Sequence, residues 1–566
     1  MSPADSSQLV PSPTPQERIR ALLRSNIELD TQAAAELRSV QEHGPEELVV
    51  YDDWMVTSEA GPERARLQSE RRKAADYVAA CDGALTCHIR RLPNELLGYI
   101  FEYCEPDRDA KVALDPVYTL KRFHALVKRH LWLISGVCWR WHAIVTGTPS
   151  LWTHFSANLH LWGHEVVEQR TLERVLAKSL DRGVPCPLSF QIGAVTDKRA
   201  PDYVYTGVLR LLADHAHRWK VVSISFDDGS WPWLAHACGR LENLEVLDVQ
   251  VGEQNPGVVS NPYLYALMPT FDYAPKLRRF AFTGDLRNLI RSMPWHQLEL
   301  FTYSSCSNEQ LLNPALLRCI PLAKLPPKAI LCLRAVLEIS HSSWTEMRPV
   351  PPIACMVHCL VLQLSRTSNE TDDVSLGNIF ASLSLPLVSQ LHIAPRMISV
   401  PKLHLPLWSR AQFSALSERS GFGMTLRHLI LFVEISVDDL LHALTDLIQL
   451  EELWITDPAL GKPALITDVL LAGLTVACSD VLLPQLISLT VSTHLTFSDS
   501  VLRCLVESRV KSLDHSDMMF CLGLYCMGRD PRSVDAEVLY RFAELVDAGV
   551  LDLDMREANM ARFYMR

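Results

Sequence analysis

Leu450-Glu451-Glu452-Leu453-Trp454-Ile455 is one copy of a loose Leu-x-x-Leu-x-Leu pattern that recurs along the chain, with other large apolar residues replacing some of the leucines. A repeat of this kind fixes the fold class, because each copy is one structural unit that packs on the next. The intervals are unequal, and the longest, the 59 residues from Leu298 to Val357, leaves room for a further copy near Ile330. The copies begin at Val221, Leu244, Leu277, Leu298, Val357, Val388, Leu426, Leu450 and Leu486.

The last two apolar positions of each copy are two residues apart, which predicts a short strand with both side chains on one face. A single copy cannot bury that face, whereas parallel copies stacked edge to edge, each followed by a returning helix or loop, enclose a continuous core. Pro275, Pro386 and Pro484 precede strands, where proline is tolerated. The sequence therefore predicts an irregular α/β solenoid with a parallel sheet over residues 158–512. An ordinary α/β domain is the alternative, since its parallel strands give a similar pattern.

The residues between the core positions should form the other face of the sheet, and most of them are small or polar. The exceptions lie in two neighbouring copies, and an aromatic cluster exposed on a polar sheet is typical of a protein-binding surface. Our hypothesis is that this cluster binds a target protein. Residues 513–566, which we expect to be a helical cap or tail, would bury it in the alternative arrangement. The cluster consists of His428, Ile430, Phe432, Glu452 and Trp454.

A second informative stretch, Leu92-Pro93-Asn94-Glu95-Leu96-Leu97-Gly98-Tyr99-Ile100-Phe101, precedes the repeats. It predicts a short helix that Pro93 opens, because a missing N–H costs nothing in the first turn. Helical spacing places Leu96, Leu97, Ile100 and Phe101 on one face, which must be buried against something. The segments Val137-Cys138-Trp139-Arg140-Trp141 and Thr148-Pro149-Ser150-Leu151-Trp152 follow downstream.

These segments, in this order, resemble an F-box, particularly the fungal type, and the repeats resemble the degenerate leucine-rich repeats that follow it in many such proteins. The resemblance implies that residues 87–157 bind a Skp-type adaptor, which connects the protein to a cullin-based ubiquitin ligase, while the repeats hold an unidentified target protein. It also implies which residues meet the adaptor or support the helices that do: Leu92, Pro93, Leu96, Leu97, Ile100, Phe101, Val137, Cys138 and Trp141.

The sequence departs from a compact F-box at residues 105–121, a charged insertion that contains Pro106 and Pro116. Loop-closure entropy grows slowly with length, so the insertion is tolerable, although it can cover part of the adaptor surface. Two alternatives therefore remain open. In one, the helical region is merely a cap on the repeats. In the other, the protein is a leucine-rich-repeat interaction scaffold that acts outside ubiquitination.

The N-terminal part is expected to be helical over residues 14–86, after a Ser/Pro-rich and disordered segment at 1–13. A capping box at Thr14-Pro15-Gln16-Glu17 opens the first helix, and Gly44-Pro45 and Gly61-Pro62 punctuate the next stretch. The following helix, from Pro62 to about Asp82, has only a thin apolar stripe, which favours packing on the F-box over dimerisation. We expect a monomer apart from the ligase complex.

Composition restricts the class of protein further. The chain has 566 residues, 48% of them hydrophobic, enough for more than one structural unit. Its net charge is 54 − 65 = −11, and the absence of a long basic cluster argues against nucleic-acid binding. The 15 cysteines are odd in number and no signal peptide precedes them, which indicates reduced thiols and a cytoplasmic or nuclear protein that is not secreted. The apolar segment from Val469 to Cys478 is too short to cross a membrane.

Catalytic motifs are not evident in the sequence. It contains no Gly-rich phosphate loop, no His-Glu-x-x-His and no Gly-x-Ser-x-Gly, and Gly421-Phe422-Gly423 lacks the third glycine of a dinucleotide site. Cys355-x-x-His358-Cys359 has metal-ligand spacing but no second pair, which favours core packing over zinc. We therefore expect no cofactor and no enzymatic activity, and interpret the chain as a non-catalytic substrate receptor.

Overall fold

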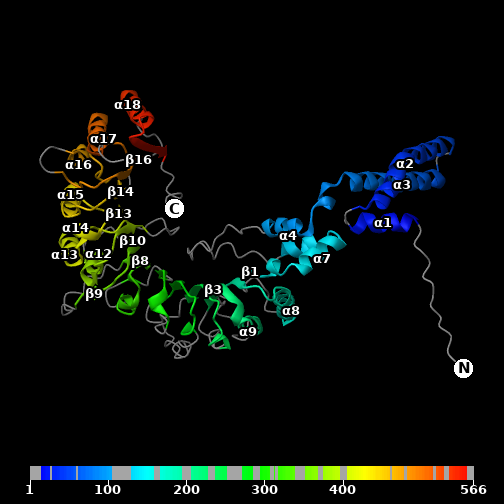
Figure 1. Ribbon diagram of the computed structural model, residues 1–566, viewed down its shortest axis with the longest axis horizontal. Helices are drawn as coiled ribbons and strands as arrows, with labels where there is room; N and C mark the ends of the chain where they lie inside the picture. Colours follow the sequence, from blue (N-terminus) through cyan, green and yellow to red (C-terminus); the bar gives the residue numbers. More distant parts are fainter. Residues whose placement is uncertain are drawn as a thin grey trace. The chain divides into compact units, whose positions relative to one another are not determined.

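The computed structural model separates the chain into two compact units, an N-terminal helical unit and a C-terminal unit that contains the parallel sheet from residue 189 onward (Figure 1). The structure describes residues 15–25, 29–58, 61–104, 129–158, 166–193, 206–226, 236–251, 271–284, 293–305, 311–312, 317–337, 351–366, 374–395, 404–458, 462–476, 481–513, 518–527 and 534–557. The segments 1–13 and 105–121, which we expected to be a disordered tail and an insertion, lie outside these residues.

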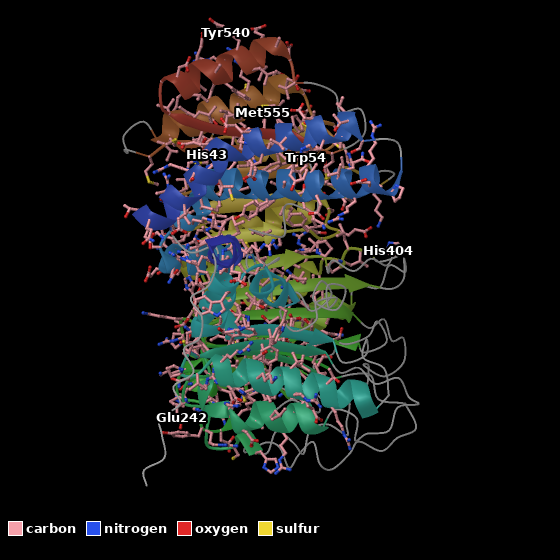
Figure 2. All side chains as sticks on the ribbon, turned by 90° about the vertical axis from the view of Figure 1, so that its right-hand side faces the viewer. His43, Trp54, Glu242, His404, Tyr540 and Met555 are labelled. Carbon is pink, nitrogen blue, oxygen red and sulfur yellow. The ribbon has the colours of Figure 1, made fainter. Side chains whose placement is uncertain are left out.

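Three helices, α1 (Pro15–Ser25), α2 (Thr31–Thr57) and α3 (Pro62–Thr86), begin the N-terminal unit. Asp30 caps α2 by accepting a hydrogen bond of 2.6 Å from the backbone N–H of Ala33. The helix then continues through Gly44 and Pro45, where the sequence suggested a break. Tertiary packing explains the difference: Gly44 lies against Val78 of α3 so closely that a β-carbon would be 2.4 Å from Cγ2. His43 and Trp54 mark α2 in Figure 2.

The segment after α3 forms a small helical domain with its own core. Arg182 covers the core on one side, its guanidinium 5.0 Å from the ring centroid of Trp132 and 4.7 Å from that of Trp152. The core consists of Leu97, Phe101, Leu131, Ile144, Val145, Leu151 and Trp152. The elements are η1 (His88–Arg91), α4 (Asn94–Tyr103), α6 (Arg129–Ser135), α7 (Trp139–Gly147), η2 (Pro149–Trp152), β1 (His154–Asn158) and α8 (Val166–Arg182).

In the C-terminal unit, strands pair in parallel, and their order across the sheet follows their order in the chain. This is the arrangement of a solenoid. The order is β2 (Leu188–Gly193), β3 (Trp219–Phe226), β4 (Val246–Val251), β5 (Arg279–Thr283), β6 (Leu300–Ser304), β8 (Ile330–Leu337), β10 (Cys359–Arg366), β12 (Gln390–Ala394), β13 (His428–Leu431), β14 (Glu452–Thr456), β15 (Ser488–Thr493), β16 (Phe520–Cys526) and β17 (Leu551–Glu557). β7 (Leu311–Leu312) pairs with β8, and β9 (Ile353–Ala354) pairs with β11 (Leu383–Ser384).

Helices and 3-10 turns connect these strands, and α13, α15 and α16 follow one side of the sheet in Figure 1. Together with the sheet they confirm the expected α/β solenoid. They are α9 (Thr206–Asp214), η4 (Ala216–Arg218), η8 (Trp295–Gln297), η9 (Leu322–Lys324), α12 (Val374–Ser382), α13 (Arg410–Ser420), α14 (Phe422–Thr425), α15 (Val437–Thr445), α16 (Asp468–Leu474), α17 (Asp499–Leu513) and α18 (Ala536–Asp547). None of the described helices is long and apolar enough to span a membrane.

The strand register aligns the leucines of successive copies. The further copy expected near Ile330 is strand β8, which carries the first leucine of this row. At one register position the side chains of Leu331, Leu360, Leu391, Leu429, Leu453, Leu489 and Leu522 are all buried. We call the opposite side of the sheet, which carries the residues alternating with these leucines, the variable face.

Residues 513–566 contradict the expectation of a helical cap or tail, because they add β16, α18 and β17 to the solenoid. Phe520, Leu522 and Leu524 alternate in the core, and Cys521 and Gly523 lie between them on the variable face. Figure 2 labels Tyr540 on α18 and Met555 on β17.

Candidate protein-binding surfaces

Helix α4 carries two apolar faces where the sequence suggested one. It begins at Asn94, directly after Pro93, whose carbonyl accepts the first helical hydrogen bond from Leu97 N–H at 3.1 Å. Leu97 and Phe101 point into the core, with 1% and 2% of their surface exposed. The side chains of Leu96, Tyr99, Ile100 and Tyr103 are exposed by 48%, 60%, 44% and 79%. The expected adaptor face thus divides into supporting residues and residues that can contact a partner.

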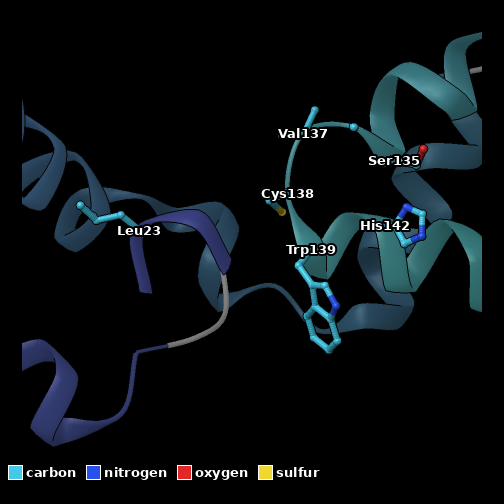
Figure 3. Close-up of a pocket in the computed structure, with 7 residues that line it drawn as sticks. Leu23, Ser135, Val137, Cys138, Trp139 and His142 are labelled. Carbon is cyan, nitrogen blue, oxygen red and sulfur yellow. The ribbon is translucent and has the colours of Figure 1, made fainter. Parts of the chain in front are cut away.

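A second exposed apolar group lies at the turn between α6 and α7. Leu133, Val137 and Trp139 are exposed, whereas Trp141 turns inward and packs 5.0 Å from the ring of Phe101. The sulfur of Cys138 caps α7 by accepting a hydrogen bond from the backbone N–H of Trp141 at 3.4 Å. Figure 3 shows the open pocket of about 660 Å³ that this turn forms with α1. Its lining residues are Leu23, Ser135, Gly136, Val137, Cys138, Trp139 and His142.

Two arginines hold these elements in place. Arg140 of α7 donates to the side-chain oxygen of Asn94 at 3.0 Å and to the carbonyls of Arg90 and Leu92. Arg90 is 5% exposed and donates to the carbonyls of Leu22 and Leu23, each at 3.3 Å. Both exposed apolar groups are therefore presented by helices whose ends are fixed by hydrogen bonds to charged donors. These contacts join residues far apart in the chain, so no local sequence pattern indicates them.

The cluster predicted for target binding lies on the variable face of β13 and β14. His428 and Glu452 are register partners, and the imidazole Nδ1 lies 2.8 Å from the carboxylate Oε2. His392 of β12 is the register partner of Ile430. Burial lowers the pKa of His392, nearby His428 lowers it further, and the charge of Glu452 opposes the shift. Glu452 is exposed, as we expected for this cluster, whereas His428, Ile430 and Trp454 are partly buried.

The prediction that Phe432 is exposed is wrong, because only 3% of its surface is exposed. Strand β13 ends at Leu431, and the Phe432 ring packs edge-on against Trp454, with 5.5 Å between the ring centroids. On its other side, Trp454 stacks on Tyr525 of β16 at 6.3 Å and 26°. Tyr525 was not among the predicted residues, because its segment was expected to be a helical cap or tail. Trp454 is thus the centre of an aromatic group in which Phe432 has a supporting position.

On β3 to β6 the variable face has a different character. Asp248, which the repeat register suggested to be exposed, is 4% exposed. Its Oδ2 accepts hydrogen bonds from Ser223 Oγ at 3.0 Å and Gln250 Nε2 at 3.4 Å. Burial raises the pKa of Asp248 to about 6, although the two hydrogen bonds and the charge of Arg334 oppose the shift. Thr302 and Ser304 are buried as well.

The cysteine and histidine residues with metal-ligand spacing do not converge. Cys355 and Cys359 are buried, at 0% and 3% exposure, and burial raises the pKa of their thiols to about 11 and about 12. His358 is instead exposed beside the hydroxyl of Ser389. Among the described residues, no group of three His, Cys, Asp or Glu side chains is placed to hold a metal ion.

The fold defines a protein with a small helical domain and a long α/β solenoid in one chain. Residues 89–158, which contain the helical domain from Ile89 to the end of β1, match the model of the F-box-like family. The match supports an F-box protein, a class that typically binds Skp-type adaptors and serves cullin ligases as substrate receptors. No curated protein shows significant similarity to the sequence.

Proposed function

We propose that this protein is a non-catalytic substrate receptor whose F-box-like domain binds a Skp-type adaptor and whose solenoid presents a target protein to a cullin-based ubiquitin ligase. One observation carries the proposal: the domain that matches the F-box-like family exposes Leu96 and Ile100 on α4 together with Val137 and Trp139. Exposed apolar side chains grouped in this way on a small domain are typical of a protein–protein interface.

The energetics of such an interface are favourable. Complete burial of an aliphatic side chain contributes roughly 1.5–3 kcal/mol, so half-exposed Leu96 and Ile100 contribute about 1 kcal/mol each, and the exposed rings of Tyr99 and Trp139 contribute more. An interface of roughly 1,000 Å² or more is needed for specific association, and the neighbouring polar residues complete it.

Acceleration of ubiquitin transfer would then come from proximity. A target held on the solenoid has a raised effective concentration near the conjugating enzyme, so this chain need not supply an acid, a base or a nucleophile. The reactive thioester belongs to other subunits of the ligase.

The test is binding of the full chain to a purified Skp-type adaptor. Leu96→Asp/Ile100→Asp places two charges in the interface and is expected to weaken binding at least 100-fold. Val49→Asp/Val56→Asp is the matched control, because both valines are exposed on α2, at 57% and 83%. Circular dichroism of each variant checks the fold. A folded wild-type chain that does not bind the adaptor would contradict the proposal and favour a repeat scaffold outside ubiquitination.

A further inference from the structure

Strands β14 to β17 form one part of the variable face with an unusual distribution of side-chain size. The register aligns Glu452, Ser488, Cys521 and Asp552 in one row and Trp454, Thr490, Gly523 and Asp554 in the next. The outer strands thus carry carboxylates and an indole, and the two middle strands carry small side chains. Since neighbouring strands lie about 4.8 Å apart, the outer strands are separated by about 14 Å.

Gly523 contributes to the low middle of this surface. A β-carbon at that position would lie 2.9 Å from the hydroxyl and 3.1 Å from the methyl group of Thr490, so a larger residue would displace its neighbour. Cys521, one row away on the same strand, is partly exposed. We call the residues Glu452, Cys521, Gly523, Asp552 and Asp554 the acidic floor.

The charges of the acidic floor converge on Cys521. Burial raises the pKa of the Cys521 thiol, and the negative charges of Asp552 and Glu452, on opposite sides of it, raise it further. Asp552 has no cation within salt-bridge distance among the residues that the structure describes, whereas Glu452 contacts His428 and Asp554 contacts Arg556 at 2.6 Å. The centre of the floor therefore has a negative potential that the protein does not neutralise locally.

Aromatic and hydroxyl groups border the same surface. Tyr525 donates a hydrogen bond of 3.0 Å to Asp554 and stacks on Trp454. Next along this face, Thr456 and Ser492 are 3% and 1% exposed, and in the described part of the chain their hydroxyls have no hydrogen-bond partner. Carboxylates beside aromatic rings, with spare hydroxyl groups, favour a cationic side chain that also has an apolar stem.

We infer that the acidic floor binds a basic segment of the target protein, with a lysine or arginine side chain above Cys521 and between Glu452 and Asp552. The inference rests on the proposed function, since it names the chemistry of the target. Charge complementarity selects this occupant: an acidic or neutral segment would leave Asp552 unpaired on desolvation, which costs binding energy.

Cys521 provides a direct probe of this surface in the full chain. A methanethiosulfonate reagent converts the thiolate to a mixed disulfide and releases methanesulfinate, and the modified peptide is quantified by mass spectrometry. The negative potential should make a trimethylammonium reagent react at least about 10-fold faster than a sulfonate reagent at low ionic strength. The ratio of the two rates does not depend on the thiolate fraction, which is common to both reagents.

Glu452→Gln/Asp552→Asn should reduce this ratio at Cys521 about fivefold or more. Asp438→Asn/Glu537→Gln, which removes two charges from α15 and α18, should leave it unchanged. Exposed Cys504 in the same digest is the internal reference. A ratio near one in the wild type, or a ratio that the Glu452 and Asp552 substitutions do not change, would overturn the inference.

Occupancy is tested with a tetra-arginine peptide as the probe. It should slow modification of Cys521 by the neutral methyl reagent several-fold in the wild type and have little effect in Glu452→Gln/Asp552→Asn. A tetra-glutamate peptide should have no effect. Equal protection of wild type and double variant would contradict binding at this floor. Adaptor binding, measured with the same variants, should be unchanged, so failure here with the adaptor bound rejects only this inference.

Discussion

Two parts of the variable face differ although the same repeat pattern produces them. On β3 to β6 its polar side chains, such as Ser223, Asp248 and Thr302, are buried. On β14 to β17, Glu452 and Asp552 are exposed and Trp454 and Cys521 partly so. The repeat fixes which side chains point away from the leucine core, but it does not fix whether they reach solvent. The second part therefore offers a group of carboxylates to a partner, whereas β5 in the first part exposes the single cation Arg279.

The largest difference in the free energy of unfolding is expected between alanine substitutions of Trp295, which precedes β6, and of Trp454, which lies in β14. Trp295, 1% exposed, packs against Phe280 and Phe301, and Trp295→Ala is expected to lower the free energy of unfolding by ~3–5 kcal/mol. Trp454→Ala should lower it by about 1 kcal/mol, because its ring is partly exposed, while it removes protection of Cys521 by tetra-arginine. Urea unfolding followed by circular dichroism measures both, and equal losses would contradict the contrast.

The next largest difference in the free energy of unfolding is expected between substitutions of two buried aspartates, Asp457 after β14 and Asp248 in β4. Asp457, 2% exposed, accepts hydrogen bonds from the backbone N–H groups of Leu465, Ile466 and His494 and from Thr493 Oγ1, at 2.8–3.0 Å. Asp457→Ala leaves three buried donors and one partly buried donor without this acceptor and should cost ~3 kcal/mol or more of unfolding free energy. Asp457→Asn, which retains one acceptor oxygen, should recover part of it. A loss below 1 kcal/mol for the alanine variant would show that water replaces the carboxylate.

In contrast to Asp457, the ionised carboxylate of Asp248 should lower the stability of the fold, and its contribution to the free energy of unfolding should depend on pH. Its folded pKa of about 6 lies above the unfolded value of about 4, so the folded state binds the proton more tightly. Its contribution to stability is therefore present below pH 4 and lost as pH rises to 6, by about 3 kcal/mol. Asp248→Asn should be about as stable as the wild type at pH 4 and more stable at pH 7.5. Urea unfolding of both proteins across this range gives the difference, and a constant difference would contradict the raised pKa.

The smallest effect concerns two surface ion pairs that precede equivalent strands. Arg278 pairs with Glu299 before β5 and β6, and Arg427 pairs with Glu451 before β13 and β14. All four side chains are partly or largely exposed, so Glu299→Gln and Glu451→Gln should each lower the free energy of unfolding by less than about 1 kcal/mol. Comparison of the two variants by urea unfolding would show whether the difference between the two parts extends beyond the variable face.

The fold could be predicted where leucine spacing alone determines the structure. The pattern that begins at Leu450 fixes the alternation of buried and unburied side chains in β14, and the same argument places β12, β13 and β15. The same spacing is present at Leu522 and Leu524 of β16 and at Leu553 and Met555 of β17, but these copies were not recognised because residues 513–566 were expected to be a helical cap or tail. The prediction also failed at Gly44-Pro45, because the packing of α2 on α3 outweighs the local preference for a break.

The candidate binding surfaces could be predicted only in part, since exposure depends on residues distant in sequence. Helical spacing groups Leu96, Leu97, Ile100 and Phe101, but the position of Trp141 determines that Phe101 is in the core and leaves Ile100 exposed. The functions assigned to these residues, and to Trp454, stay predictions until the variants are measured.

The agreement between strand order and chain order has a further consequence, for how the solenoid responds to force or heat. Each strand contacts mainly its immediate neighbours. The stability of the solenoid is therefore approximately the sum of the stabilities of single repeats and of the interfaces between neighbouring repeats. Among the strands that the structure describes, β17 lies at the end of this array and pairs with β16 alone. Unfolding should therefore begin by fraying at that end, and a ligand that bridges β14 and β17 would act as a clasp on the part of the molecule that opens first.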